Sequence, residues 1–153
     1  LYVTTDRLSD DSFRIIGTFE QLRVLQIRNE SMDDANLAAI SDLTNMQSLI
    51  LYSQRITDGC LQHVTKMKKL YNLRLGNSKI TDAGLKHLQG LTSLTHLNIG
   101  YTDITDDGLK HLQGLKNLED LTIWFTKVTD AGMQHLAGLT RSLLPTCMMN
   151  LAI

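Results

Sequence analysis

A period of 24 residues constrains the fold of this chain more than any other feature. The apolar residues Ile56, Ile80, Ile104 and Val128 follow one another at this interval. When the units are aligned at this interval, other apolar residues fall into columns. One column is Phe13, Leu37, Leu61, Leu85, Leu109 and Met133. Another is Phe19, Leu43, Met67, Leu91, Leu115 and Leu139. Self-similarity at a fixed period indicates a repeat protein. No single unit can bury its apolar side alone, so the units are predicted to stack into one continuous core.

Within each unit the hydrophobic spacing changes from two residues to three. Leu97 and Ile99 are separated by one polar residue, which is typical of a short strand. Leu85 and Leu88 lie three residues apart and share one face of a helix. Gly90 stands where that helix would end at a C′ glycine, as does Gly114 one unit later. Each unit is therefore predicted to be a short strand, a turn and a helix of about two turns.

The strand half of the unit carries a family resemblance. Its residues Leu94, Leu97, Ile99, Thr102 and Ile104 spell L-x-x-L-x-I-x-x-T-x-I, which resembles the leucine-rich repeat. Thr102 and Thr126 stand where the family usually has Asn or Cys, and the I-T-D-x-G-L-x-x-L half is similar to the cysteine-containing and GALA-type subclasses. The resemblance covers residues 1–139, and residues 140–153 are predicted to form an irregular C-terminal tail or cap.

The resemblance implies an α/β fold, namely a right-handed leucine-rich-repeat solenoid of about six units. A parallel sheet would line its concave face and short helices its convex face. Partners of such repeats usually bind through the sheet.

An aspartate recurs in every unit, and in most units a serine or threonine precedes it; the column is Asp10, Asp34, Asp58, Asp82, Asp106 and Asp130. Such a pair ahead of a helical pattern indicates an N-cap, and the carboxylate favours the positive end of the helix dipole. A ladder of calcium sites is the alternative, but calcium needs six or more oxygens around one ion. One aspartate per unit does not supply them, so the column is interpreted as capping.

A second column holds His63, His87, His111 and His135. On a helical wheel His87 lies away from the Leu85 and Leu88 stripe, so these side chains are predicted to flank the core on the convex side. Packed helices lie about 8–10 Å apart, too far for single-file histidines to share an ion about 2 Å from each ring nitrogen. No serine or cysteine recurs beside them. We therefore predict no metal, no cofactor and no catalytic residue, and a chain that is not an enzyme.

The outward strand positions differ between units, and in a solenoid this is where binding specificity can reside. Five of the chain's eight aromatic residues are expected on this surface: Tyr2, Tyr52, Tyr101, Trp124 and Phe125. Asn29 and Ser53 are also expected to face outward, and Gly76 and Gly100 to leave a shallow place beside Trp124. Because Trp, Tyr and Arg most often carry interface energy, the predicted partner-binding residues are Arg28, Tyr52, Arg74, Asn98, Tyr101, Trp124 and Phe125. The alternative is that the chain that follows covers Trp124.

Composition narrows the class of partner. A net charge of −1 and a pI near 6.6 argue against nucleic acid and anionic membranes, and no apolar run approaches the roughly 18 residues of a membrane span. The presence of only two cysteines favours an intracellular compartment. The N-glycosylation sequon Asn29-Glu30-Ser31 instead favours a secreted protein.

The two ends lack the caps that solenoids normally need. The first strand column begins at Leu1, in mid-unit, and Pro145 falls at a strand position, where it would end the sheet. The chain is therefore interpreted as a fragment of a longer protein. The alternative is a homodimer that joins the uncapped ends.

The predicted function is a non-catalytic protein–protein interaction scaffold that binds a protein partner through its concave sheet. Two alternatives stay open. The array could be the substrate-recognition arm of a larger protein, such as an F-box-type ubiquitin-ligase receptor or a bacterial effector, which depends on the family resemblance alone. It could also be a regulatory or structural spacer of a multidomain enzyme.

Overall fold

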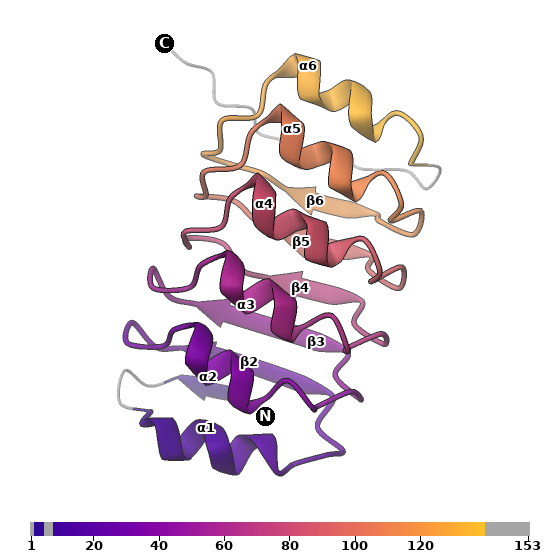
Figure 1. The fold of residues 1–153 in the computed structure, drawn as a ribbon. Coiled ribbons are helices and arrows are strands. Elements are labelled where there is room, and N and C mark those ends of the chain that lie inside the picture. The colour runs from indigo at the N-terminus through magenta and orange to yellow at the C-terminus, as the bar shows by residue number, and fades with distance from the viewer. Residues whose placement is uncertain (1, 5–7, 140–153) are drawn as a thin grey trace.

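The computed structural model describes residues 2–4 and 8–139 and shows the predicted solenoid (Figure 1). Six strands form one parallel sheet in chain order: β1 (Tyr2–Thr4), β2 (Val24–Arg28), β3 (Ser48–Tyr52), β4 (Asn72–Arg74), β5 (His96–Asn98) and β6 (Asp120–Thr122). Six helices stack beside it: α1 (Asp10–Gly17), α2 (Asp34–Ala39), α3 (Asp58–His63), α4 (Asp82–Leu85), α5 (Asp106–Leu109) and α6 (Asp130–Met133). The last three continue into 3₁₀ turns: η1 (Lys86–Leu88), η2 (Lys110–Leu112) and η3 (Gln134–Leu136).

The strand register confirms the 24-residue period. Leu49 pairs with Leu25 on β2 and with Leu73 on β4, and all three side chains are buried between the sheet and the helices. Leu85 and Leu88 complete this core from the helical side. Each fully buried leucine contributes roughly 1.5–3 kcal/mol, and stacking of the units supplies the apolar surroundings that one unit lacks.

Helix α1 departs from the predicted core. Phe19 was assigned to a core column, but its side chain is 46% exposed. Ile15 is 59% exposed on the same helix. The prediction for Phe19 is wrong because α1 is the first helix of the stack, and among the described residues no further unit packs against its outer side.

Asn29 and Ser53 are buried, so the prediction that they face outward is wrong. Strands β2 and β3 are five residues long, and the alternation of inward and outward side chains continues past their ends to these two positions. The buried polar groups are satisfied: Nδ2 of Asn29 donates to the carbonyl of Leu8 at 3.2 Å, and the hydroxyl of Ser53 donates to the carbonyl of Met32 at 2.6 Å.

The three later strands are shorter, and the chain turns differently after them. Asn77, Tyr101 and Phe125 take positive φ values of 60°, 56° and 52° and are exposed. The next residue then turns inward, and its hydroxyl donates to a carbonyl three residues earlier. Thr102 does so to Ile99 at 2.6 Å. The threonine that replaces the family's usual Asn or Cys thus still satisfies a backbone group under the turn.

The aspartate column links neighbouring units. In α4 the N-cap is Thr81, whose hydroxyl oxygen accepts from the backbone N–H of Ala83 at 3.3 Å. Asp58, from the preceding unit, accepts from the N–H of Thr81 at 2.7 Å and from its hydroxyl at 2.6 Å. The same paired contact joins Asp34 to Thr57, Asp82 to Thr105 and Asp106 to Thr129. Here the cap is therefore the threonine, and the expectation that the aspartate caps its own helix is wrong for these four.

The first units use a variant of this link. Asp33 is the N-cap of α2 and forms a capping box with Asn36. Nδ2 of Asn36 also donates to Asp10 of the preceding unit at 2.8 Å. An asparagine amide here replaces the threonine contact of the later units.

The ends of the helices are also not as predicted in detail. Helix α4 tightens into η1, and Gly90 follows the C-cap residue Gln89. No glycine in the described part of the chain has a positive φ, so Gly90 and Gly114 do not form left-handed C′ stops.

Leu1, Pro145 and the tail 140–153 lie outside the described residues, so the division at residue 139 stays a prediction. The homodimer through the ends likewise stays a prediction. None of the helices in residues 8–139 has the length and apolar character required to cross a membrane.

Candidate functional site

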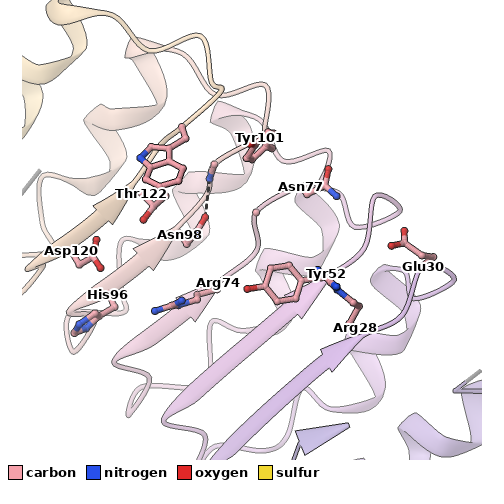
Figure 2. Close-up of a pocket in the computed structure, with 13 residues that line it drawn as sticks. Arg28, Glu30, Tyr52, Arg74, Asn77, His96, Asn98, Tyr101, Asp120 and Thr122 are labelled. Carbon is pink, nitrogen blue, oxygen red and sulfur yellow. Dashed lines mark hydrogen bonds between the residues drawn. The ribbon is translucent and has the colours of Figure 1, made fainter. Parts of the chain in front are cut away.

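A groove of about 580 Å³ crosses the face of the sheet opposite the helices (Figure 2). Six of the seven predicted partner-binding residues line it: Arg28, Tyr52, Arg74, Asn98, Tyr101 and Trp124. Phe125, the seventh, stacks on Tyr101 at its rim. The groove is also lined by Glu30, Asn77, His96, Asp120 and Thr122. These were not among the predicted binding residues, although the strand positions of His96, Asp120 and Thr122 follow from the period.

Equivalent positions of neighbouring units form a row across the groove. In one such row two glycines lie between two aromatic residues. Arg28 pairs with Tyr52 in the sheet register, and Gly76, Gly100 and Trp124 occupy the equivalent place just beyond the ends of β4, β5 and β6. Tyr52 and Trp124 are three strands apart, or about 14 Å at the usual strand spacing of about 4.8 Å. No side chain rises from the row between them.

The glycines are required by close approach. A Cβ at Gly76 would lie 2.8 Å from Oδ1 of Asn98, and one at Gly100 would lie 3.1 Å from the carbonyl oxygen of Trp124. Both glycines are themselves buried under these neighbours. The Asn98 amide and the Trp124 backbone therefore form part of the floor of the shallow place expected beside Trp124. The floor does not consist of glycine alone.

Trp124 itself is partly buried. The alternative interpretation, in which the following chain covers Trp124, involves residues 140–153, which lie outside the described part of the structure.

Hydrogen-bond donors are concentrated in the centre of the groove. Nε of Arg74 donates to Oδ1 of Asn72 at 3.4 Å, and Nδ2 of Asn72 donates to the hydroxyl of Ser48 at 2.9 Å. On the neighbouring strand Asn98 is paired with Arg74 in register, and its Oδ1 accepts from the N–H of Gly100 at 3.1 Å. Because a backbone N–H can only donate, this contact fixes which end of the Asn98 amide is oxygen.

The charged groups of the groove are of both signs. The guanidinium carbon of Arg28 lies 5.4 Å from the ring centroid of Tyr52, within the range of a cation–π contact. Neither Arg28 nor Arg74 forms an ion pair within residues 8–139. Glu30 lies at one end of the groove, near Arg28, and Asp120 at the other (Figure 2).

Tyr101 and Phe125 form an exposed and strained pair. Their ring centroids lie 4.4 Å apart with an interplanar angle of 23°, yet the side chains are 54% and 58% exposed. Left-handed backbone costs an L-residue roughly 1–2 kcal/mol, and ring stacking returns only about 0.5–1.5 kcal/mol for the pair. The equivalent residue one unit earlier is Asn77, a residue type that tolerates positive φ. The aromatic pair therefore costs stability at a place where the fold accepts asparagine.

The histidine column lies where it was predicted. His87 is exposed, and the other three histidines are partly buried on the helical side. Nδ1 of His111 lies 3.0 Å from Nε2 of Gln89 in the preceding unit.

Cys60 is buried, and burial, followed by the nearby carboxylates of Asp34 and Asp58, raises the pKa of its thiol. In the described part of the chain, no three His, Cys, Asp or Glu side chains are grouped closely enough to hold a metal ion.

The parallel sheet in chain order and the stacking of 24-residue units define the class: the chain is a leucine-rich-repeat solenoid. The family model "Leucine rich repeat" matches residues 68–128, which confirms the predicted resemblance. The GALA-type or cysteine-containing subclass stays a prediction. Solenoids of this class generally serve as protein-interaction scaffolds, and they are generally not catalysts.

Two solved structures illustrate the likeness. An internalin C2 from Listeria monocytogenes is 24% identical, with a TM-score of 0.66 over 86% of this chain and 54% of its own chain. An internalin from the same species is 20% identical, with a TM-score of 0.49 over 84% of this chain and 48% of its own chain. The present chain thus spans about half the length of these proteins, and the first likeness concerns the fold. No curated protein matches the sequence.

Proposed function

We propose that this chain is a non-catalytic module that binds a protein partner through the concave groove and the Tyr101–Phe125 pair at its rim. The observation that carries the proposal is the strain of that pair. Backbone strain persists only where the surrounding structure enforces it, and such strain is concentrated at functional sites. Two exposed aromatic side chains that reduce stability and do not fill the core supply rigid contact area for a partner.

The arrangement of the groove supports the same proposal. Tyr52 and Trp124 flank a row without side chains, and the pair Tyr101–Phe125 adds aromatic surface beyond the carboxyl ends of β5 and β6. A partner segment in the groove would therefore meet large aromatic surfaces on several sides and polar donors at the centre. Aromatic anchors surrounded by polar groups are typical of protein interfaces.

The double variant Tyr101→Asn/Phe125→Asn tests this directly, because it copies the residue found at the equivalent position 77. We expect the free energy of unfolding in urea to stay within about 1 kcal/mol of wild type or to rise, since relief of strain offsets the lost stacking. We also expect at least a fivefold loss of partner recovery when the purified chain is immobilised and used to capture proteins from an extract of its source, identified by mass spectrometry.

Tyr71→Asn is the matched control. Tyr71 is 43% exposed, lies directly before β4 and does not line the groove, so its removal should leave partner recovery unchanged. Equal recovery by wild type and by the double variant would contradict the proposal and favour a structural spacer. A destabilisation of the double variant by several kcal/mol would contradict the strain argument on its own.

We further propose that the partner is the substrate of a larger protein that contains this array as its recognition arm. This finer proposal is supported by the resemblance alone. Sequencing of the complete reading frame, followed by a search for a catalytic domain, tests it; a reading frame that encodes only repeats would contradict it.

A further inference from the structure

We infer that the centre of the groove binds a carboxylate, carried by an acidic side chain of an extended partner segment, between Arg74 and Asn98. This inference rests on the proposed function and specifies the chemistry of the partner. It is derived from the donors that the groove presents and from the way the fold orients them.

Arg74 is held in place by the strand that carries it. Its Nε donates to Oδ1 of Asn72 at 3.4 Å, and Asn72 is in turn held by the buried Ser48 through a hydrogen bond of 2.9 Å. The contact at Nε leaves both terminal nitrogens of the guanidinium for a ligand. In Figure 2 the Arg74 side chain extends along the groove between Tyr52 and His96. A guanidinium with two open terminal nitrogens matches the two oxygens of a carboxylate.

Asn98 adds a donor from the neighbouring strand. Its oxygen is occupied by the N–H of Gly100 at 3.1 Å, and its amide NH₂ makes no hydrogen bond within the described residues. Arg74 and Asn98 are register partners, so their Cα atoms lie about 4.8 Å apart. Two oriented donor groups at this spacing match a carboxylate, which provides acceptors on both of its oxygens.

The charges of the groove favour the same ligand. Arg28 and Arg74 lack a carboxylate partner within residues 8–139, and Arg28 is held over Tyr52. The acidic residues of the groove, Glu30 and Asp120, lie at its two ends and not beside Asn98 (Figure 2). An acidic side chain at the centre would thus be attracted by the arginines, whereas a basic one would be repelled by them.

The length of the groove sets the form of the ligand. Between Tyr52 and Trp124 the row free of side chains spans about 14 Å, which corresponds to about four residues of extended chain at about 3.3 Å each. Apolar side chains two residues before and two residues after the acidic residue lie on the same side of an extended chain as its carboxylate, and would then contact Tyr52 and Trp124.

The test uses two peptides that differ in one charge, acetyl-Phe-Ala-Glu-Ala-Phe-amide and acetyl-Phe-Ala-Gln-Ala-Phe-amide. Trp124 is the only tryptophan of the chain and lines the groove, so its fluorescence reports occupancy. We expect the Glu peptide to bind with at least a fivefold lower Kd at low ionic strength. The Arg74 Nε–H and Asn98 side-chain NH₂ resonances should shift in NMR spectra with the Glu peptide and not with the Gln peptide.

The variant Arg74→Gln should reduce the Kd ratio of the two peptides to less than twofold. Lys86→Gln removes one positive charge from the helical side, where Lys86 is exposed, and should keep the full ratio. Equal binding of both peptides in the groove would overturn the carboxylate inference and leave the concave interaction standing. A ratio that persists in Arg74→Gln would also overturn it. Binding of neither peptide at millimolar concentration would count against both this inference and the proposed function.

Discussion

The contact between Asp58 and Gly84 leads to a prediction that contradicts helix propensity. Gly84 lies inside α4 and does not have a positive φ, so Gly84→Ala would ordinarily stabilise the helix by about 1 kcal/mol. In this fold a Cβ at position 84 would lie 2.3 Å from Oδ1 of Asp58. The carboxylate of Asp58 is held by the N–H and the hydroxyl of Thr81 at 2.7 and 2.6 Å. It cannot move away without breaking both contacts.

The expected magnitude follows from these two hydrogen bonds. A hydrogen bond to a charged group contributes about 1.5–3 kcal/mol, and the lower end applies because Asp58 and Thr81 are only partly buried. Loss of two such bonds, offset by about 1 kcal/mol of helix propensity, destabilises the chain by about 2–3 kcal/mol. The Cβ would also lie 2.9 Å from Cδ1 of Leu61, but this is the end of a flexible side chain.

Urea unfolding followed by far-UV circular dichroism measures the effect. Gly114→Ala is the matched control, because the nearest atom to its Cβ would be the carbonyl oxygen of Gln89 at 4.0 Å; this variant should be as stable as wild type or more so. In an Asp58→Ala background the Gly84→Ala change should cost at least about 1.5 kcal/mol less, since contacting residues couple by about 0.5–3 kcal/mol. Stabilisation by Gly84→Ala in the wild-type background, or the same cost in both backgrounds, would refute the reasoning.

Two further predictions concern titratable groups. The backbone N–H of Thr129, and then its hydroxyl, hydrogen-bond to Asp106 and lower the pKa of that carboxyl. The stability this provides is present above the unfolded-state value of about 3.9 and lost as the pH falls through the lower folded-state pKa. Asp106→Asn should therefore be less stable than wild type at pH 7, and the difference should close toward pH 2; a constant difference would contradict this. For the buried Cys60, burial raises the pKa of the thiol. In a Cys147→Ser background, Ellman's reagent should modify the native chain at least about 100-fold more slowly than the chain unfolded in urea, because the thiolate is the nucleophile; equal rates would contradict it.

Most of the architecture could be predicted from the sequence, because a period is a property of spacing. The column of Leu25, Leu49 and Leu73 specifies which residues stack, and a register offset of 24 follows once the units are parallel. The position of the histidines on the flank follows from the helical wheel alone. The predictions failed where the stack ends, as at Phe19, because burial there depends on a neighbouring unit and not on the residue type.

The candidate site could be predicted in outline only. The outward strand positions bring Arg74 and Asn98 together by register, and the period alone indicates this. The inward turn of Asn29 and Ser53 could not be foreseen, because it depends on two extra strand residues in β2 and β3. The left-handed backbone of Tyr101 has no signal in the sequence, since an aromatic residue is among the least expected at positive φ.

The sequence by itself determined the repeating unit, its apolar columns and the order of the strands, because these depend on local spacing and on hydrophobicity. Only the tertiary structure decided what the polar residues do. The carboxylate of Asp58 serves Thr81, 23 positions later, because stacking brings those two units within hydrogen-bond distance. Gly84 must then be glycine to leave room for that carboxylate. Such requirements arise from contacts between units, and a pattern read along one unit does not contain them.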